Sequence, residues 1–229
     1  MHHWCLTQVV RGRLPVKPRP VWYSILLSGN EQGGVMMEHD WDADEELFFD
    51  ESGLVERGDC VLVVIDIQEK LLNVMNEKEQ ILDNALKLVR FADIVGLPVL
   101  VTEQEKLGPT VPALADEIKD FEPIMKLDFD AYQVPQFIKG LIDLDRETVV
   151  VCGIESHICV TQTALSLLPF FRVHVVADAV GSRTSENKAI ALQRMSDYGA
   201  TISSTEMFIY EVLKKAGTDE FKEVLKLIK

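Results

Sequence analysis

The chain has 229 residues, 47% of them hydrophobic, and a formal net charge of −14 at pH 7. This length and apolar content indicate a globular protein with one core. The negative charge argues against nucleic acids and anionic membranes as partners, because both bind clustered Lys and Arg. No apolar run reaches the roughly 18 residues that a membrane span needs.

The first 58 residues differ from the rest and are predicted to form an N-terminal extension that is poorly ordered in part. Bases dominate before Met36, and acids dominate after it. A signal-like segment at 21–27 stays open as an alternative, although no Ala-x-Ala cleavage site follows it. Two further alternatives are a start of translation at Met36 or Met37 and a short acidic segment, 44–49, that packs on the domain or on another subunit.

From Asp59 onward, short apolar runs alternate with segments of helical spacing. We expect strands at 60–65, 98–102, 123–126, 148–152, 172–177 and 200–203. We expect helices at 71–95, 111–118 and 134–142, after Cys159, and at 186–198, 206–216 and 220–228. This alternation predicts one α/β domain, residues 59–229, with a parallel sheet and helices on both of its faces.

The four cysteines predict a reducing compartment. No pair has the Cys-x-x-Cys spacing of a zinc site or a redox dithiol. Their placement does not indicate a disulfide scaffold either, so we expect a cytoplasmic protein. Cys60 and Cys152 lie within apolar runs, where a free cysteine behaves as a small buried hydrophobic residue.

Three reactive residues lie at the carboxyl ends of predicted strands: Asp66 ends the first, Lys126 ends the third, and Cys159 follows the fourth. Catalytic groups of open α/β sheets gather at the carboxyl ends of the strands. An acid that takes a thiol proton, a cation that favours the thiolate and a thiol at a helix start form a set for nucleophilic catalysis. The helix dipole is expected to make this thiol ionise readily. Taken singly, each residue also has a structural explanation, as a cap, a solvated charge or a core residue.

Segments 64–68 (VIDIQ), 126–132 (KLDFDAY) and 153–160 (GIESHICV) resemble the signature segments of the isochorismatase-like cysteine hydrolase superfamily. Further segments, at 102–104, 107–111 and 217–222, resemble its subgroup of isochorismatase domain-containing hydrolases, whose substrate is poorly defined. The resemblance implies a three-layer α/β/α fold with six mostly parallel strands. It also implies a catalytic triad of Asp66, Lys126 and Cys159.

The resemblance implies further details of the site. A non-proline cis peptide bond is expected between Ile154 and Glu155, and the backbone N–H groups of Glu155 and Cys159 are expected to form the oxyanion hole. We regard Gln104, Tyr132 and Ile154 as candidates for the substrate pocket.

No cofactor is expected. The nicotinamidase branch of the superfamily carries an Asp and two His as metal ligands between the second and third strands. Residues 103–122 contain no histidine, so we expect no metal at that place. His157 is expected to be a turn or subunit-contact residue rather than a base.

The cysteine favours acyl chemistry: hydrolysis of a small-molecule amide or a related C–N bond through a thioester-type acyl-enzyme. Two alternatives stay open. One is isochorismatase-type hydrolysis of a vinyl ether with Asp66 as the proton donor, and the other is a non-catalytic α/β scaffold protein. The resemblance also implies a homo-oligomer, and a small-molecule substrate is the other expected partner.

Overall fold

The computed structural model describes residues 53–228. The interpretations given above for 21–27, for a start at Met36 or Met37 and for 44–49 therefore lie outside the described residues. Within this part of the chain, no helix combines the length and the apolarity that crossing a membrane requires.

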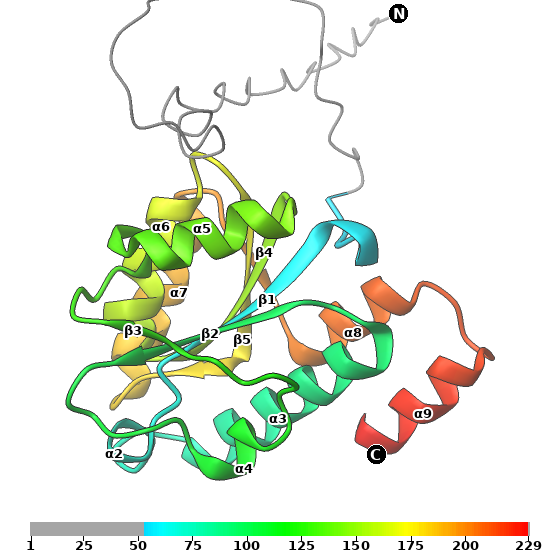
Figure 1. Ribbon diagram of the computed structural model, residues 1–229, viewed down its shortest axis with the longest axis horizontal. Coiled ribbons are helices and arrows are strands. Elements are labelled where there is room, and N and C mark those ends of the chain that lie inside the picture. The colour runs from blue at the N-terminus through cyan, green and yellow to red at the C-terminus, as the bar shows by residue number, and fades with distance from the viewer. Residues whose placement is uncertain (1–52, 229) are drawn as a thin grey trace, which may run out of the picture.

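A six-stranded parallel sheet forms the centre of the domain (Figure 1). Its strands are β1 (Cys60–Ile65), β2 (Val99–Gln104), β3 (Ile124–Lys126), β4 (Thr148–Ile154), β5 (Arg172–Gly181) and β6 (Thr201–Ser203). The strand order is β3-β2-β1-β4-β5-β6, and all the pairings between these strands are parallel. The order reverses direction between β1 and β4, which makes their carboxyl ends a topological switch point.

The apolar run of β1 fits a strand that is covered on both faces. Alternate residues of a strand point to opposite sides of the sheet. One set, Cys60, Leu62 and Val64, packs into the core on one face, and the other set, Val61, Val63 and Ile65, packs into the core on the opposite face. A buried parallel strand therefore needs an apolar residue at every position, as this sequence has.

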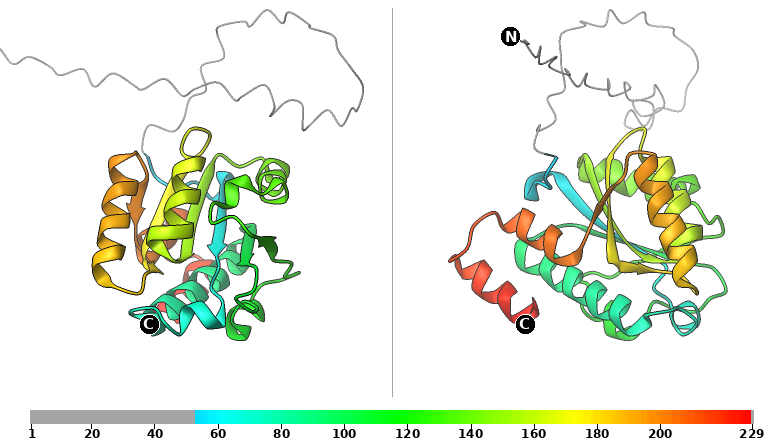
Figure 2. Two further views of the ribbon diagram at one scale, coloured as in Figure 1. Left: turned by 90° about the vertical axis from the view of Figure 1, so that its left-hand side faces the viewer. Right: turned by 180° about the vertical axis from the view of Figure 1, so that it is seen from behind.

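Helices cover both faces of the sheet, so the expected three-layer α/β/α architecture is confirmed (Figures 1 and 2). One face packs against α3 (Lys78–Val95), α4 (Pro112–Ala115), α8 (Thr205–Leu213) and α9 (Asp219–Ile228). The other face packs against α5 (Pro135–Leu144), α6 (Thr161–Leu167) and α7 (Ser185–Asp197). A short 3₁₀ turn, η2 (Ala131–Gln133), precedes α5.

Most predicted elements match the observed ones to within about three residues at each end, and three differ more in length or continuity. The single helix expected at 71–95 is two helices, α2 (Glu69–Leu72) and α3, because Glu77 between them has a left-handed φ of 57°. The helix expected at 111–118 is the one-turn α4. The strand expected at 172–177 continues as β5 to Gly181, which brings its end beside the end of β4.

Packing onto the domain begins before residue 59. Val55 is fully buried in the core that α3 and α9 share, and its N–H donates to Glu211 at 3.1 Å. Arg57, in the 3₁₀ turn η1 (Arg57–Asp59), donates to the carbonyl oxygen of Val95 at 2.7 Å and pairs with Glu220 at 3.0 Å. The residues that precede β1 therefore pack against the C-terminal end of α3.

Candidate active site

The ends of three strands carry the predicted reactive residues. Asp66 directly follows β1, and Lys126 is the last residue of β3. Cys159 lies in a π-helical turn, η3 (Ser156–Val160), which joins β4 to α6. Because the strands are parallel, these residues lie at one edge of the sheet, beside the switch point between β1 and β4.

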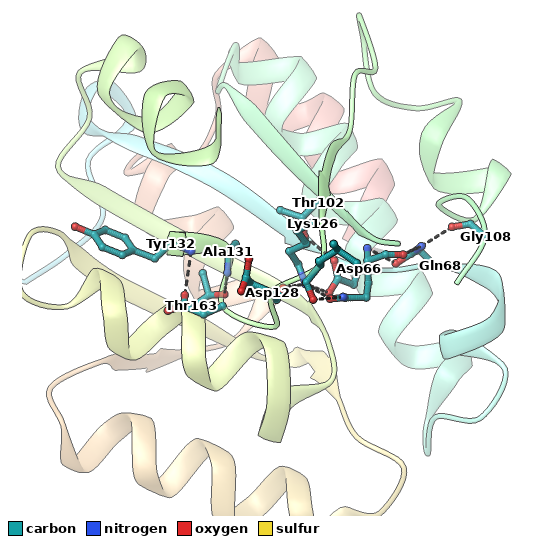
Figure 3. A network of polar contacts seen from close by, with 12 residues as sticks. Asp66, Gln68, Thr102, Gly108, Lys126, Asp128, Ala131, Tyr132 and Thr163 are labelled. Carbon is teal, nitrogen blue, oxygen red and sulfur yellow. Dashed lines mark hydrogen bonds and ion pairs between the residues drawn. The ribbon is translucent and has the colours of Figure 1, made fainter. Parts of the chain in front are cut away.

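Asp66 and Lys126 form a buried ion pair (Figure 3). Lys126 Nζ lies 2.7 Å from Asp66 Oδ2, and neither side chain is exposed to solvent. The other carboxylate oxygen, Oδ1, accepts a hydrogen bond from Thr102 Oγ1 at 2.8 Å. Thr102 belongs to β2, so the strand between β1 and β3 also holds the carboxylate in place.

Cys159 contacts both members of this pair. The residue is 5% exposed, and both Asp66 and Lys126 lie close enough to its sulfur to shift the pKa of the thiol. The structure therefore brings together all three residues that we predicted as a triad.

The expectation that the Cys159 thiol ionises readily is wrong for the free protein. Burial raises the pKa of Cys159 to about 12, the Asp66 carboxylate also raises it, and the Lys126 ammonium only partly opposes the two. The sulfur also precedes α6, which begins at Thr161. Loss of hydration and the neighbouring carboxylate therefore outweigh the favourable cation.

Gly153 lets β4 run close to the carboxyl end of β1. Its φ is +127°, and a Cβ there would lie 2.1 Å from the carbonyl oxygen of Ile65 and 2.6 Å from its nitrogen. The peptide bond between Ile154 and Glu155 is cis. Ile154 itself is fully buried in the core on the α3 side of the sheet, so its side chain is a core residue rather than part of a pocket wall.

Gln104 contacts the triad through the ammonium group of Lys126. Lys126 Nζ donates to Gln104 Oε1 at 2.7 Å and to the carbonyl oxygen of Asp128 at 3.3 Å. The sequence indicates Gln104 as a candidate pocket residue and gives no indication of a role for Asp128. The spacing of Lys126 and Asp128 carries no signal for this contact, because it uses a backbone oxygen that any residue has.

Tyr132 does not point toward the triad. In Figure 3 its ring turns away from Asp66 and Lys126, and it stacks on Phe170 with ring centroids 5.6 Å apart. The ring thus lies outside the immediate surroundings of the triad, in contrast to the pocket position that we expected.

Two polar pairs join the connection between β4 and α6 to the residues that follow β5. Arg183 Nε donates to Glu155 Oε2 at 2.9 Å, and His157 Nδ1 lies 2.9 Å from Ser182 Oγ. His157 is half-buried in this turn. Its imidazole therefore ties two loops together at the edge of the sheet.

The fold agrees with comparisons to known proteins. Residues 60–207 match the isochorismatase domain. This match covers more than half of the chain, so the chain belongs to the isochorismatase family.

Individual relatives agree with this assignment. A secreted isochorismatase effector of Phytophthora sojae is 37% identical over 176 residues, which cover 74% of this chain and 84% of that protein. The human isochorismatase domain-containing protein 2 is 37% identical over 181 residues, or 77% of this chain and 86% of that protein.

Solved structures show the same fold. The MAR1 ribonuclease of Caenorhabditis elegans superimposes with a TM-score of 0.71 at 34% identity and covers 76% of this chain and 92% of its own. An octameric hydrolase of unknown specificity from Escherichia coli superimposes with a TM-score of 0.72 at 23% identity and covers 76% and 90%.

Proposed function

We propose that the protein is a cysteine-dependent hydrolase that cleaves an amide or a related C–N bond of a small molecule. The observation that carries the proposal is the contact of one buried thiol with a carboxylate and an ammonium that form an ion pair. A thiol, a proton acceptor and a fixed cation are the groups that covalent acyl transfer needs.

Asp66 acts as the base in this proposal. The raised pKa keeps Cys159 a thiol at neutral pH, so the proton passes to Asp66 as the sulfur attacks the carbonyl carbon. The backbone N–H groups of Glu155 and Cys159 stabilise the oxyanion. Lys126 compensates the negative charge that develops on the sulfur while it loses its proton and attacks the carbonyl carbon.

Breakdown of the intermediate completes the cycle. The C–N bond breaks, the proton on Asp66 passes to the leaving nitrogen, and a thioester remains on Cys159. Asp66 then takes a proton from a water molecule whose oxygen attacks the thioester. The C–S bond breaks, the acid departs, and the sulfur recovers the proton.

Hydrolysis of a vinyl ether is a second candidate, which the name of the Phytophthora relative favours. In this reaction Asp66 in its acid form donates a proton to the vinyl carbon. Water then adds to the oxocarbenium carbon and returns a proton to Asp66, and the C–O bond of the hemiketal breaks, while Cys159 forms no bond. The ribonuclease name of the Caenorhabditis structure suggests RNA as a third substrate. The net charge of −14 disfavours it, because RNA attracts clustered bases.

The proposal also covers the cellular compartment and the oligomeric state of the enzyme. A catalytic thiol stays reduced in the cytoplasm, so we place the activity there; secretion is the alternative that the name of the Phytophthora relative raises. We also propose a homo-oligomer, in line with the octameric assembly of the Escherichia coli hydrolase.

A substrate screen tests the function. The full chain is incubated with small amides, carbamates and isochorismate, beside Cys159→Ala and a control, Cys60→Ala, whose thiol lies in the β1 core. We expect C–N cleavage that falls at least about 10³-fold in Cys159→Ala and persists in Cys60→Ala. Full C–N cleavage by Cys159→Ala contradicts the mechanism. Cleavage of isochorismate alone, unchanged in Cys159→Ala, supports the vinyl-ether reaction instead.

A further inference from the structure

The ammonium of Lys126 is surrounded by oxygen acceptors from three elements. Besides the Asp66 carboxylate at 2.7 Å, Nζ meets Gln104 Oε1 at 2.7 Å and the carbonyl oxygen of Asp128 at 3.3 Å. An ammonium has three N–H groups, and two of them donate to the neutral oxygens of Gln104 and Asp128, which leaves the third for the side of Asp66 and Cys159. Only the Asp66 group is charged, and the side chain of Lys126 is fully enclosed.

The side-chain amide of Gln104 has one orientation that satisfies its neighbours. Its Nε2 donates to the carbonyl oxygen of Leu127 at 2.7 Å, while its Oε1 faces Lys126. A carbonyl oxygen only accepts and an ammonium only donates, so a reversed amide would lose both hydrogen bonds. Gln104 is 8% exposed, which leaves little room for water to replace either partner.

The backbone of Gln104 is fixed by another buried glutamine, Gln68. The Gln68 amide accepts from the N–H of Gln104 at 2.8 Å and donates to its carbonyl oxygen at 3.0 Å, as a neighbouring strand would. It also donates to the carbonyl oxygen of Gly108 (Figure 3). The N–H of Gln68 bonds the carbonyl oxygen of Asp66 at 2.7 Å. These bonds tie the ends of β1 and β2 together beside Lys126.

We propose that Gln104 is a positioning residue, which aims the Lys126 ammonium at Asp66 and Cys159 through a neutral acceptor. The inference rests on the proposed function, in which Lys126 favours the Cys159 thiolate. A carboxylate at this place would accept the same hydrogen bond, but its charge would offset the ammonium and disfavour the thiolate. An apolar side chain would add no charge but would leave one N–H of the ammonium without its acceptor.

The test measures the rate at which iodoacetamide alkylates Cys159 in the full chain at pH 8. The variants are Gln104→Glu and Gln104→Met, and the control is Gln136→Glu, which adds the same charge at an exposed position in the first turn of α5. We expect alkylation about 10-fold slower in Gln104→Glu and about 3-fold slower in Gln104→Met, because the alkylation rate follows the thiolate fraction. The control should stay within about twofold of the parent chain.

A merely structural role predicts the opposite direction, since looser packing exposes the thiol and speeds alkylation. Alkylation of folded Gln104→Glu at the control rate or faster overturns the proposal. If circular dichroism shows that this variant is unfolded, Gln104→Met decides by the same criterion. On a substrate from the screen, we further expect kcat to fall in Gln104→Met while KM stays unchanged, and the reverse pattern counts against positioning.

Alkylation needs no substrate, so two failures can be told apart. A parent chain that cleaves no C–N bond contradicts the proposed function, and slower alkylation in the Gln104 variants then still supports the positioning role. A parent chain that cleaves such a bond beside unchanged alkylation in those variants overturns the positioning role alone.

Discussion

Lys126 Nζ lies 2.7 Å from Asp66 Oδ2 in the interior of the protein, although β2 separates the strands that carry the two residues. A buried charge without its partner costs far more than an exposed one. We therefore expect Lys126→Met and Asp66→Asn each to lower the free energy of unfolding by about 3–5 kcal/mol.

The double variant Asp66→Asn/Lys126→Met should lose less than the sum of the single losses, because no charge is left alone. Urea unfolding followed by circular dichroism measures all three. The control is Lys139→Met, which breaks an exposed pair with Asp143 one turn along α5 and should cost about 0.5 kcal/mol or less. Additive losses in the double variant would count against the strong coupling that a buried pair implies.

The raised pKa of Cys159 predicts how its reactivity depends on pH. With a pKa of about 12, the thiolate fraction should rise about tenfold for each pH unit between 7 and 9. Alkylation by iodoacetamide, followed by mass spectrometry of the peptide that contains Cys159, checks this slope. Cys152 is fully buried and serves as the internal control that stays unlabelled. A rate that levels off below pH 8 is incompatible with this pKa.

Gly153 should tolerate no side chain. A Cβ would lie 2.1 Å from the carbonyl oxygen of Ile65, a backbone atom that cannot turn away, and the φ of +127° already disfavours other residues. We expect Gly153→Ala to lose about 3 kcal/mol or more of unfolding free energy, or to give no folded protein.

Gly140→Ala is the matched control for Gly153→Ala. This glycine lies within α5, and its Cβ would meet only the side chain of Leu100 at 3.4 Å. Alanine is the better helix former, so we expect a gain of about 0.5–1 kcal/mol. Equal effects of the two variants in thermal and urea unfolding would contradict the close approach of β4 to β1.

His174 should make the fold sensitive to acid. It is 4% exposed in β5, and burial, with a smaller contribution from Arg172, lowers its pKa from 6.5 to about 4. The unfolded chain therefore binds the proton first, and stability falls as the pH drops from 6.5 toward 4. At pH 5 the loss through this residue should be about 1–2 kcal/mol.

The variant His174→Phe cannot take up this proton. Its free energy of unfolding should fall less steeply than that of the parent chain between pH 6.5 and pH 4.5. The comparison uses urea unfolding at several pH values in one buffer series. Parallel pH curves for the two proteins would mean that His174 does not contribute.

Local patterns were sufficient for most of the elements. The run Cys60–Ile65 was predicted as a strand with the bounds that it has, because every position is apolar. The region 71–95 was predicted as one helix because its apolar spacing continues across Glu77. The left-handed φ of Glu77 breaks that helix, and apolar spacing does not report the backbone angle of a single polar residue.

The site could be predicted only in part, because contacts between side chains depend on how strands far apart in the chain pair. Asp66, Lys126 and Cys159 stand out as reactive residues at strand ends. The sequence indicates Gln104 as a pocket candidate but not its contact with Lys126, because that contact depends on how β2 and β3 pair. Gln68 lies within a segment that resembles a family signature, yet its side chain binds the backbone of Gln104 in β2, 36 residues further along the chain.

Apolar periodicity and polar residues at strand ends are local properties, so the amino-acid order alone indicates the α/β class and the residues available for chemistry. The strand order, the meeting of Asp66 with Lys126 across β2 and the high pKa of the Cys159 thiol arise only in the folded protein. They do so because hydration and the distances between charges depend on how segments far apart in the chain pack against one another.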